Sequence, residues 1–209
     1  MTLDEFWKLH EALPVNDAAD VLTQRLKQLD AASVQAFNQH QVQCAIQAYS
    51  WDLWGAAYLI DGGCSDDGFM DFRYGLMARG RQVFEAALLD PDTLAQVTDD
   101  ESDEGYIPNE DMAYVADRAY LALTGEALPQ IETTYPEDPT GDEWDFDDEE
   151  LCRTKFPALW AKHGASGDEH VDGHAAGKSL GAPALDPSHL GDLGEVPVGD
   201  NRTGRRVGG

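Results

Sequence analysis

The sequence predicts an all-α protein, made of a compact multi-helix domain, an acidic C-terminal extension and a disordered tail. Apolar residues recur every three or four positions through most of its first part, and capping residues and glycines bound the periodic segments. No segment alternates apolar and polar residues between hairpin turns. We therefore expect a helical domain over residues 1–127, an acidic arm with one terminal helix over 128–163, and a Gly/Ala/Pro-rich tail over 164–209.

The N-terminal residues predict two short helices. Thr2 and Glu5 have the spacing of a capping box, in which each side chain binds the other residue's backbone N–H. They predict a helix whose apolar face reaches Leu13 and which stops before Pro14. Asp17 is expected to cap a second helix, since apolar residues at helical spacing follow it.

The segment from Ser33 to Gly62 is rich in Gln and Ala, which favour helix. We expect one long helix, or two stacked helices, opened by Ser33. Gly62 should end it, and Gly80 should end the helix after that. A short helix then precedes Asp90 and Pro91, which combine a cap with proline at the first helical position.

The composition changes in the last part of the chain. Asn109 is expected to cap a helix that Gly125 ends. Residues 129–150 contain three prolines and no basic residue, which is typical of an extended arm. Residues 150–164 predict a last helix, with Pro157 near its start or at a kink. The tail has hardly any large apolar residue, so we expect it to be disordered.

The charge excludes several classes of function. With 40 acidic and 14 basic residues, the formal net charge is -26, which opposes direct binding to nucleic acid or to an anionic membrane. It favours a basic protein partner or a bound cation. The N-terminus does not resemble a signal peptide, and no stretch approaches the roughly 20 apolar residues of a transmembrane helix. Three cysteines without a CxxC pair suit the reducing cytoplasm.

The segment between Asp61 and Arg73 offers one candidate site. Asp66, Asp67 and Asp71 place carboxylate oxygens close together in the sequence, and hard cations such as Mg²⁺ or Ca²⁺ bind oxygen ligands. A divalent cation is the one cofactor that this pattern suggests. It could activate water for hydrolysis, while Arg73 stabilises negative charge. The spacing does not fit an EF-hand loop.

The same segment also has a purely structural explanation. Gly62 permits a positive φ at a helix end, and Ser65 can cap the next helix. Arg73 could form a buried ion pair with an acid such as Asp52 and hold this corner closed. Cys64 has no histidine near it in the sequence, so a buried, inert thiol is the expectation rather than a nucleophile.

The acidic arm offers a second candidate site. Trp144 and Phe146 alternate with Asp145, Asp147 and Asp148. Aromatic side chains in this pattern can insert into the groove of a basic partner while the carboxylates surround it. The alternative is that the two aromatic rings fold back onto the protein's own surface.

The run "WDLWGAAYLIDGGCSDDGFMDFRYGLMARGRQVFEAALLDPDTLA", together with "FWKLHEAL" near the N-terminus, resembles a bacterial family known as domain of unknown function 4240. The resemblance covers roughly the first 125 residues, and "YGLMARG" departs from the family pattern, where a further tryptophan is expected. It implies a compact, mainly helical, cytoplasmic domain without an assigned activity. The acidic arm and the tail lie outside it.

Two hypotheses about function follow. The first is a non-enzymatic acidic interaction module that binds a basic protein partner through the arm, with an inhibitor or immunity-like role as one form of it. The alternative is a metal-dependent hydrolase or small-ligand binder that uses Asp66, Asp67, Asp71 and Arg73. A pocket formed across distant helices is a third possibility. The sequence does not define an oligomeric state.

Overall fold

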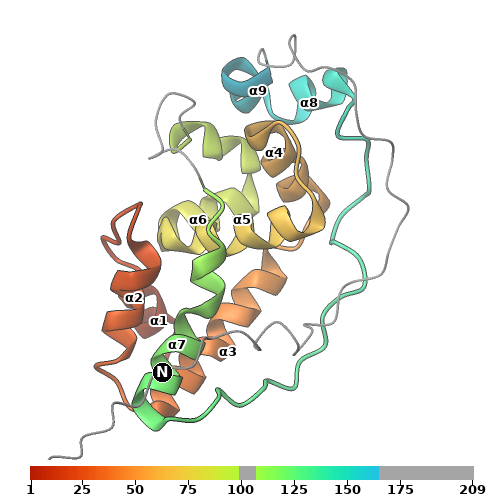
Figure 1. Cartoon of the computed structure of the whole chain (residues 1–209). Helices are drawn as coiled ribbons and strands as arrows, with labels where there is room; N and C mark the ends of the chain where they lie inside the picture. Colours follow the sequence, from red (N-terminus) through yellow and green to blue (C-terminus); the bar gives the residue numbers. More distant parts are fainter. Residues whose placement is uncertain (99–106, 165–209) are drawn as a thin grey trace, which may run out of the picture. The chain divides into compact units, whose positions relative to one another are not determined.

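The described part of the chain is helical, as the sequence predicts. The computed structural model describes residues 1–98 and 107–164, and its only β pairing in those residues is an isolated bridge between Ser50 and Thr140 (Figure 1). The predicted tail lies almost wholly outside the described residues. The elements are α1 (Leu3–Leu9), α2 (Ala18–Leu26), α3 (Ala31–Gln47), α4 (Trp51–Asp61), α5 (Asp66–Ala78), α6 (Arg81–Leu89), the 3₁₀ helices η1 (Pro91–Gln96) and η3 (Glu110–Tyr114), then α7 (Val115–Thr124), α8 (Glu149–Lys155) and α9 (Pro157–His163).

The first helix begins where the sequence predicts and ends earlier. The Thr2–Glu5 capping box is present, with Glu5 N–H donating to the Thr2 hydroxyl at 3.2 Å. The helix ends at Leu9, and Ala12 has a φ of 52°, so Leu13 lies beyond the helix and not on its face. Asp17 stands at the N-cap of α2 but makes no side-chain capping bond.

The long Gln-rich segment forms two helices, α3 and α4, and not one long helix. The break falls at Ala48–Ser50, where Ser50 accepts a hydrogen bond from Leu53 N–H and starts α4. The expectation that Ser33 opens α3 is wrong by one turn. Asp30 is the N-cap, and its carboxylate accepts from Ser33 N–H at 2.7 Å.

Two helices lie where the sequence predicts one terminal helix. Phe156 has φ -132° and ψ 64°, so the backbone leaves the helical region between α8 and α9. Pro157 then occupies the first turn of α9, where its missing N–H costs nothing. Asn109, expected to cap by its side chain, makes no capping bond, and the first turn of that segment is the 3₁₀ helix η3.

The hydrophobic core joins all parts of the described chain. Phe6, Trp7, Phe37 and Phe84 form one aromatic cluster, with ring centroids about 5 Å apart in successive pairs. Phe156 from the C-terminal segment belongs to the same core. α9 packs on α4 and η1, while α7 packs on α2 and α3. Figure 1 shows the segment between α7 and α8 as an extended trace, which leads from the end of α7 to α8 and α9 near α4.

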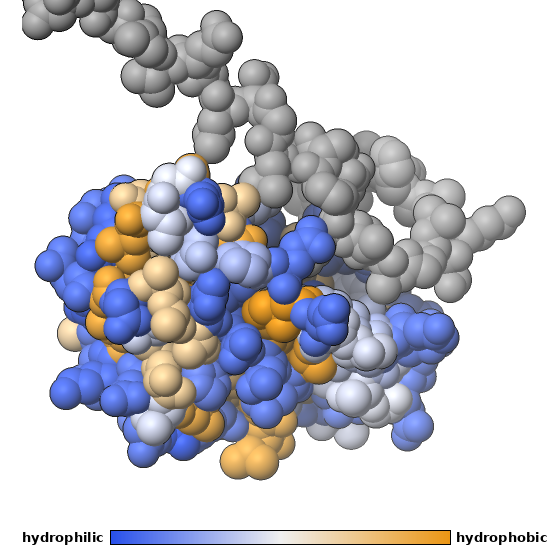
Figure 2. All heavy atoms as spheres, turned by 90° about the horizontal axis from the view of Figure 1, so that it is seen from below, coloured by the Kyte–Doolittle hydropathy of each residue, from blue (hydrophilic) through white to orange (hydrophobic). Residues whose placement is uncertain are grey.

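The surface is predominantly polar on the face that Figure 2 displays, where hydrophobic residues gather in smaller groups between hydrophilic ones. The large hydrophobic side chains that remain exposed include Leu89, Leu121 and Leu123. Among the described residues, none of the helices has the length and apolar character needed to cross a membrane.

Candidate functional site

The corner between α4 and α5 forms as a capped turn. Gly62 adopts the left-handed conformation, with φ 65°, and ends α4. Ser65 begins α5, and its hydroxyl accepts from Gly68 N–H at 3.2 Å. Asp66 and Asp67 follow in the first turn of α5, where their negative charge is favourable to the helix dipole.

The three candidate aspartates are placed unevenly. Asp66 and Asp67 are exposed, while Asp71 is half-buried. Burial, together with the neighbouring charges of Glu110 and Asp67, raises the pKa of Asp71. In residues 1–98 and 107–164, no group of three or more His, Cys, Asp or Glu side chains is arranged to hold a metal ion.

Arg73 points away from these aspartates and into the protein. It is only 9% exposed, and its guanidinium donates from Nη1 to the Ala45 carbonyl at 2.8 Å and from Nε to the Phe69 carbonyl at 3.3 Å. Its Cζ atom lies 4.8 Å from the centroid of the Tyr49 ring and 5.1 Å from that of Phe69. The structure therefore separates Arg73 from the acidic cluster to which the sequence assigned it.

The expected ion pair between Arg73 and Asp52 does not form. Asp52 instead accepts from Lys155 Nζ at 2.7 Å and so ties α4 to α8. Sequence spacing could not reveal this pair, because 103 positions separate the two residues. The pair is partly exposed, so its contribution to stability is small, at most about 1 kcal/mol.

Cys64 is not activated as a nucleophile. Burial raises the pKa of its thiol to about 12, and the negative charges of Asp61, Asp66 and Asp71 act in the same direction. Nucleophilic attack requires the thiolate, which is scarce at neutral pH under these conditions. The Cys64 carbonyl accepts a hydrogen bond from Trp54 Nε1 at 3.0 Å, so this residue helps to hold the corner against α4.

The two aromatic residues of the arm lie against the protein's own helix α4. Trp144 packs directly over Gly55, so that a Cβ placed on Gly55 would lie 2.1 Å from Trp144 Cζ2. Phe146 lies among the rings of Trp51, Trp54 and Tyr58, with centroid distances of 5.5 to 6.0 Å. Both side chains are half-buried. Glycine in the middle of a helix is the sequence signal for such a close approach.

The carboxylates of the same segment face outward. Asp145, Asp147 and Asp148 are all exposed, as are Asp142 and Glu143 before them. Asp147 accepts from the Tyr58 hydroxyl at 2.7 Å, and this bond and burial raise the pKa of Tyr58 to about 12. Asp148 is the N-cap of α8 and accepts from the N–H groups of the two residues Glu150 and Leu151. The aromatic rings thus hold the backbone while the carboxylates stay on the surface.

A second contact fixes the C-terminal helices and was not foreseen from the sequence. The Asp92 carboxylate accepts hydrogen bonds from Ala158 N–H and Leu159 N–H, at 2.8 to 3.0 Å. It therefore caps α9 from a distant part of the chain. Lys162 donates from Nζ to the carbonyls of Ala95 and Thr98, at the other end of the same helix.

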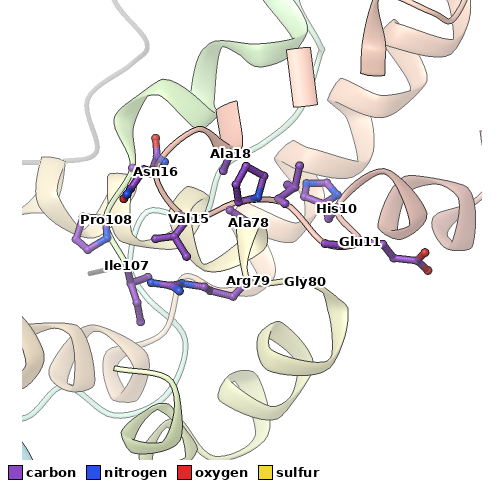
Figure 3. Close-up of a pocket in the computed structure, with 15 residues that line it drawn as sticks. His10, Glu11, Val15, Asn16, Ala18, Ala78, Arg79, Gly80, Ile107 and Pro108 are labelled. Carbon is purple, nitrogen blue, oxygen red and sulfur yellow. The ribbon is translucent and has the colours of Figure 1, made fainter. Parts of the chain in front are cut away.

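A pocket of about 520 Å³ lies between the loop after α1, the end of α5 and the segment that follows residue 106 (Figure 3). His10, Asn16, Arg79 and Asn109 supply polar side chains to its lining. The segment that follows residue 106 approaches α5 closely at Gly75. A Cβ at this position would lie 1.7 Å from the Ile107 carbonyl oxygen, so the approach requires glycine. This pocket is formed across distant segments, and none of its polar residues was a candidate from the sequence.

Comparison with known proteins places the chain in a family. Residues 1–122, more than half of the chain, match the family described as "Protein of unknown function (DUF4240)", and the chain belongs to it. No curated protein and no solved structure gives a significant match. The matched region ends inside α7, so the arm, α8 and α9 lie beyond it.

Proposed function

We propose that this member of the DUF4240 family is an acidic interaction module, which binds a basic surface of a protein partner through the carboxylates of residues 142–150. The observation that supports this most directly is that the aromatic side chains of the arm pack inward while its carboxylates face outward. Trp144 and Phe146 are held against α4, and the carboxylates around them are exposed. An arm anchored in this way presents its charges without having to order the backbone on binding.

The proposal changes the role of the two aromatic residues. The pattern in the sequence suggested that they insert into the partner. Trp144 contacts Gly55, and Phe146 contacts three rings of α4, so both are occupied within the chain. The partner would instead meet the carboxylates of Asp142, Glu143 and Asp145. A formal net charge of -26 would also steer a basic partner toward the protein from a distance.

Binding to a short fluorescent peptide rich in Lys and Arg, followed by anisotropy at low and high salt, tests the proposal. The variant Asp142→Asn, Glu143→Gln, Asp145→Asn removes three exposed charges from the arm. A matched control, Asp66→Asn, Asp67→Asn, Glu110→Gln, removes three exposed charges near the α5 corner. If each local charge contributes about 0.5 kcal/mol, the arm variant binds about tenfold more weakly than wild type.

The control separates a local surface from general charge attraction. We expect it to weaken binding by less than about twofold, because salt screens charges farther than about 10 Å from the peptide. Equal losses in the two triple variants would show that only the net charge matters and would refute the proposal. A larger loss in the corner variant would move the binding surface to α5.

A further inference from the structure

The pocket beside the loop after α1 has no part in the acidic surface proposed above. Its volume of about 520 Å³ lies within the range of pockets that hold small molecules. One side is the loop of residues 10–16, another is the segment that begins at Ile107, and the end of α5 completes the lining (Figure 3). The described residues of the lining all belong to the region that matches the DUF4240 family.

Hydrogen bonds hold two sides of the pocket in place. Arg25 donates from Nη1 to the carbonyls of Leu9 and Glu11, each at 2.7 Å, and so fixes the start of the loop. Ala12 then has a φ of 52°, a left-handed conformation that is uncommon for a residue with a side chain. On the opposite segment, Asn109 N–H donates to an α5 carbonyl at 3.1 Å. A site that is already ordered loses little conformational freedom when a ligand binds.

His10 lines the pocket and has an unused hydrogen-bond acceptor. Its side chain is 1% exposed, and its Nδ1–H donates to the Phe6 carbonyl at 3.0 Å. In the neutral ring Nε2 is then the nitrogen that accepts, and it has no hydrogen-bond partner among the described residues. Because a buried acceptor without a partner is unfavourable, a ligand that donates a hydrogen bond to Nε2 would gain from satisfying it.

The apolar and amide groups of the lining favour a flat ring with polar edges. Apolar surface comes from both sides of the pocket, from Leu13 and Val15 of the loop and from Ile107 of the segment opposite. The amides of Asn16 and Asn109 each offer a donor and an acceptor. Asparagine amides pair in this way with the edges of nucleobases, which carry ring nitrogens and exocyclic polar groups.

The charges of the lining favour a ligand without a net charge. Among its described residues, Glu11 and Arg79 are the charged ones, and their charges are opposite. Figure 3 shows the Glu11 carboxylate directed away from the other lining side chains, so it is not placed to bind a cation inside the pocket. An anion would be repelled by a protein whose formal net charge is -26.

We propose that this pocket binds a small neutral heterocycle that carries ring N–H groups and carbonyl groups, as a pyrimidine base does. A ring N–H donates to His10 Nε2, and a carbonyl oxygen of the ligand accepts from the amide of Asn16. The volume leaves room for a substituent on the ring. The site is separate from the carboxylates of residues 142–150, so either proposal can fail without the other.

Saturation-transfer NMR with uracil as the probe tests the site. We expect transfer from the wild-type protein to the two carbon-bound protons of uracil. Transfer to 1,3-dimethyluracil, which has the same ring and no N–H group, should be at least about fivefold lower, because the hydrogen bond to Nε2 is lost. Asn16→Ala should lower the transfer to uracil about threefold. Gln39→Ala, which removes an exposed amide on α3 outside the lining, is the matched control and should behave as wild type.

Two comparisons decide the outcome. Equal transfer to uracil and 1,3-dimethyluracil in the wild type would overturn the proposal, as would the absence of transfer to uracil. Equal signals from Asn16→Ala and Gln39→Ala would place the binding elsewhere and would also overturn it. His10→Asn should remove the preference for uracil over the dimethyl compound. If that variant folds poorly, the pair of probes still tests His10, because it leaves the protein unchanged.

Discussion

His10 should make the stability of the protein fall as the pH is lowered. Its side chain is 1% exposed and lies among the rings of Phe6, Trp7 and Phe37. Nδ1–H donates to the Phe6 carbonyl at 3.0 Å, and Nε2 has no partner among the described residues. A proton on Nε2 would create a buried charge without an acceptor. Burial accordingly lowers the pKa of His10 to about 4, from 6.5, and the nearby charge of Arg25 acts in the same direction.

The sign and size of the effect follow from linkage. Well above pH 6.5 the imidazole is neutral in the folded and the unfolded chain, and His10 costs no stability. As the pH falls below 6.5, the unfolded chain gains a proton that the folded chain does not, until the pH reaches about 4. Each tenfold difference in proton affinity is worth about 1.4 kcal/mol. Between about pH 7 and pH 4.5, His10 should therefore cost about 2 kcal/mol of stability.

Other groups titrate in the same range, so a comparison of variants is needed. Burial raises the pKa of Asp61 to about 6, and protonation of that carboxylate favours the folded state as the pH falls. Relief of repulsion among the many acids acts in the same direction. The variant His10→Asn retains a donor for the Phe6 carbonyl and cannot titrate. We expect it to be less stable than wild type at about pH 7, because it leaves a cavity, and to lose this deficit largely by about pH 4.5.

Chemical denaturation of both proteins at the two pH values measures the difference directly. The free energies of unfolding should converge by about 2 kcal/mol on acidification. A difference between the two proteins that is the same at both pH values would refute the reasoning. His10→Gln serves as a second non-titrating variant if the asparagine variant does not fold.

Three further predictions concern single contacts. Gly55→Ala should displace Trp144 from α4, seen as a red shift of tryptophan fluorescence and faster proteolysis of the arm, whereas Gly68→Ala, whose Cβ would lie 3.4 Å from its nearest neighbour, should leave both unchanged. Asp92→Asn should lower the free energy of unfolding by about 1 kcal/mol, because the cap of α9 weakens, and a thermal melt that matches wild type would contradict this. Cys64 should react with a thiol reagent at neutral pH far more slowly in the folded protein than in denaturant, because the pKa of its thiol is about 12 in the fold.

Local signals in the sequence predicted the helical architecture well. The capping box at Thr2, the left-handed glycine at Gly62 and the serine cap at Ser65 all formed as expected, since each depends on residues within one turn. One error arose where two capping residues lay close together, at Asp30 and Ser33. Aspartate and serine are about equally good at an N-cap, so the sequence pattern could not rank the two.

The tertiary contacts that organise the candidate sites were not predictable in this way. Asp92 caps a helix 66 positions away, and Lys155 pairs with Asp52 across 103 positions. The sequence pattern grouped Arg73 with the acids near it in the chain. In the structure Arg73 lies on the buried side of α5, where it donates to the Ala45 carbonyl and contacts the Tyr49 ring. Helical geometry lets neighbours in sequence face opposite ways, and the spacing of Arg73 from Phe69 and Leu76 already places it on the buried face of α5. Its contacts on that face depend on the packing of α3 against α5, which the spacing does not show.

The composition changes after residue 127, but the hydrophobic core continues into the residues beyond it. Phe156 and Leu159 are buried in the same hydrophobic cluster as residues of the DUF4240 region. Trp144 needs Gly55 beneath it, and α9 needs Asp92 at its start, so the extension relies on features of the family region. The extension in turn covers the α4 face that carries Trp51, Trp54 and Tyr58. Because the apolar groups of the arm are used to make this attachment, the exposed carboxylates of Asp142, Glu143 and Asp145 are the groups that the arm presents on the surface.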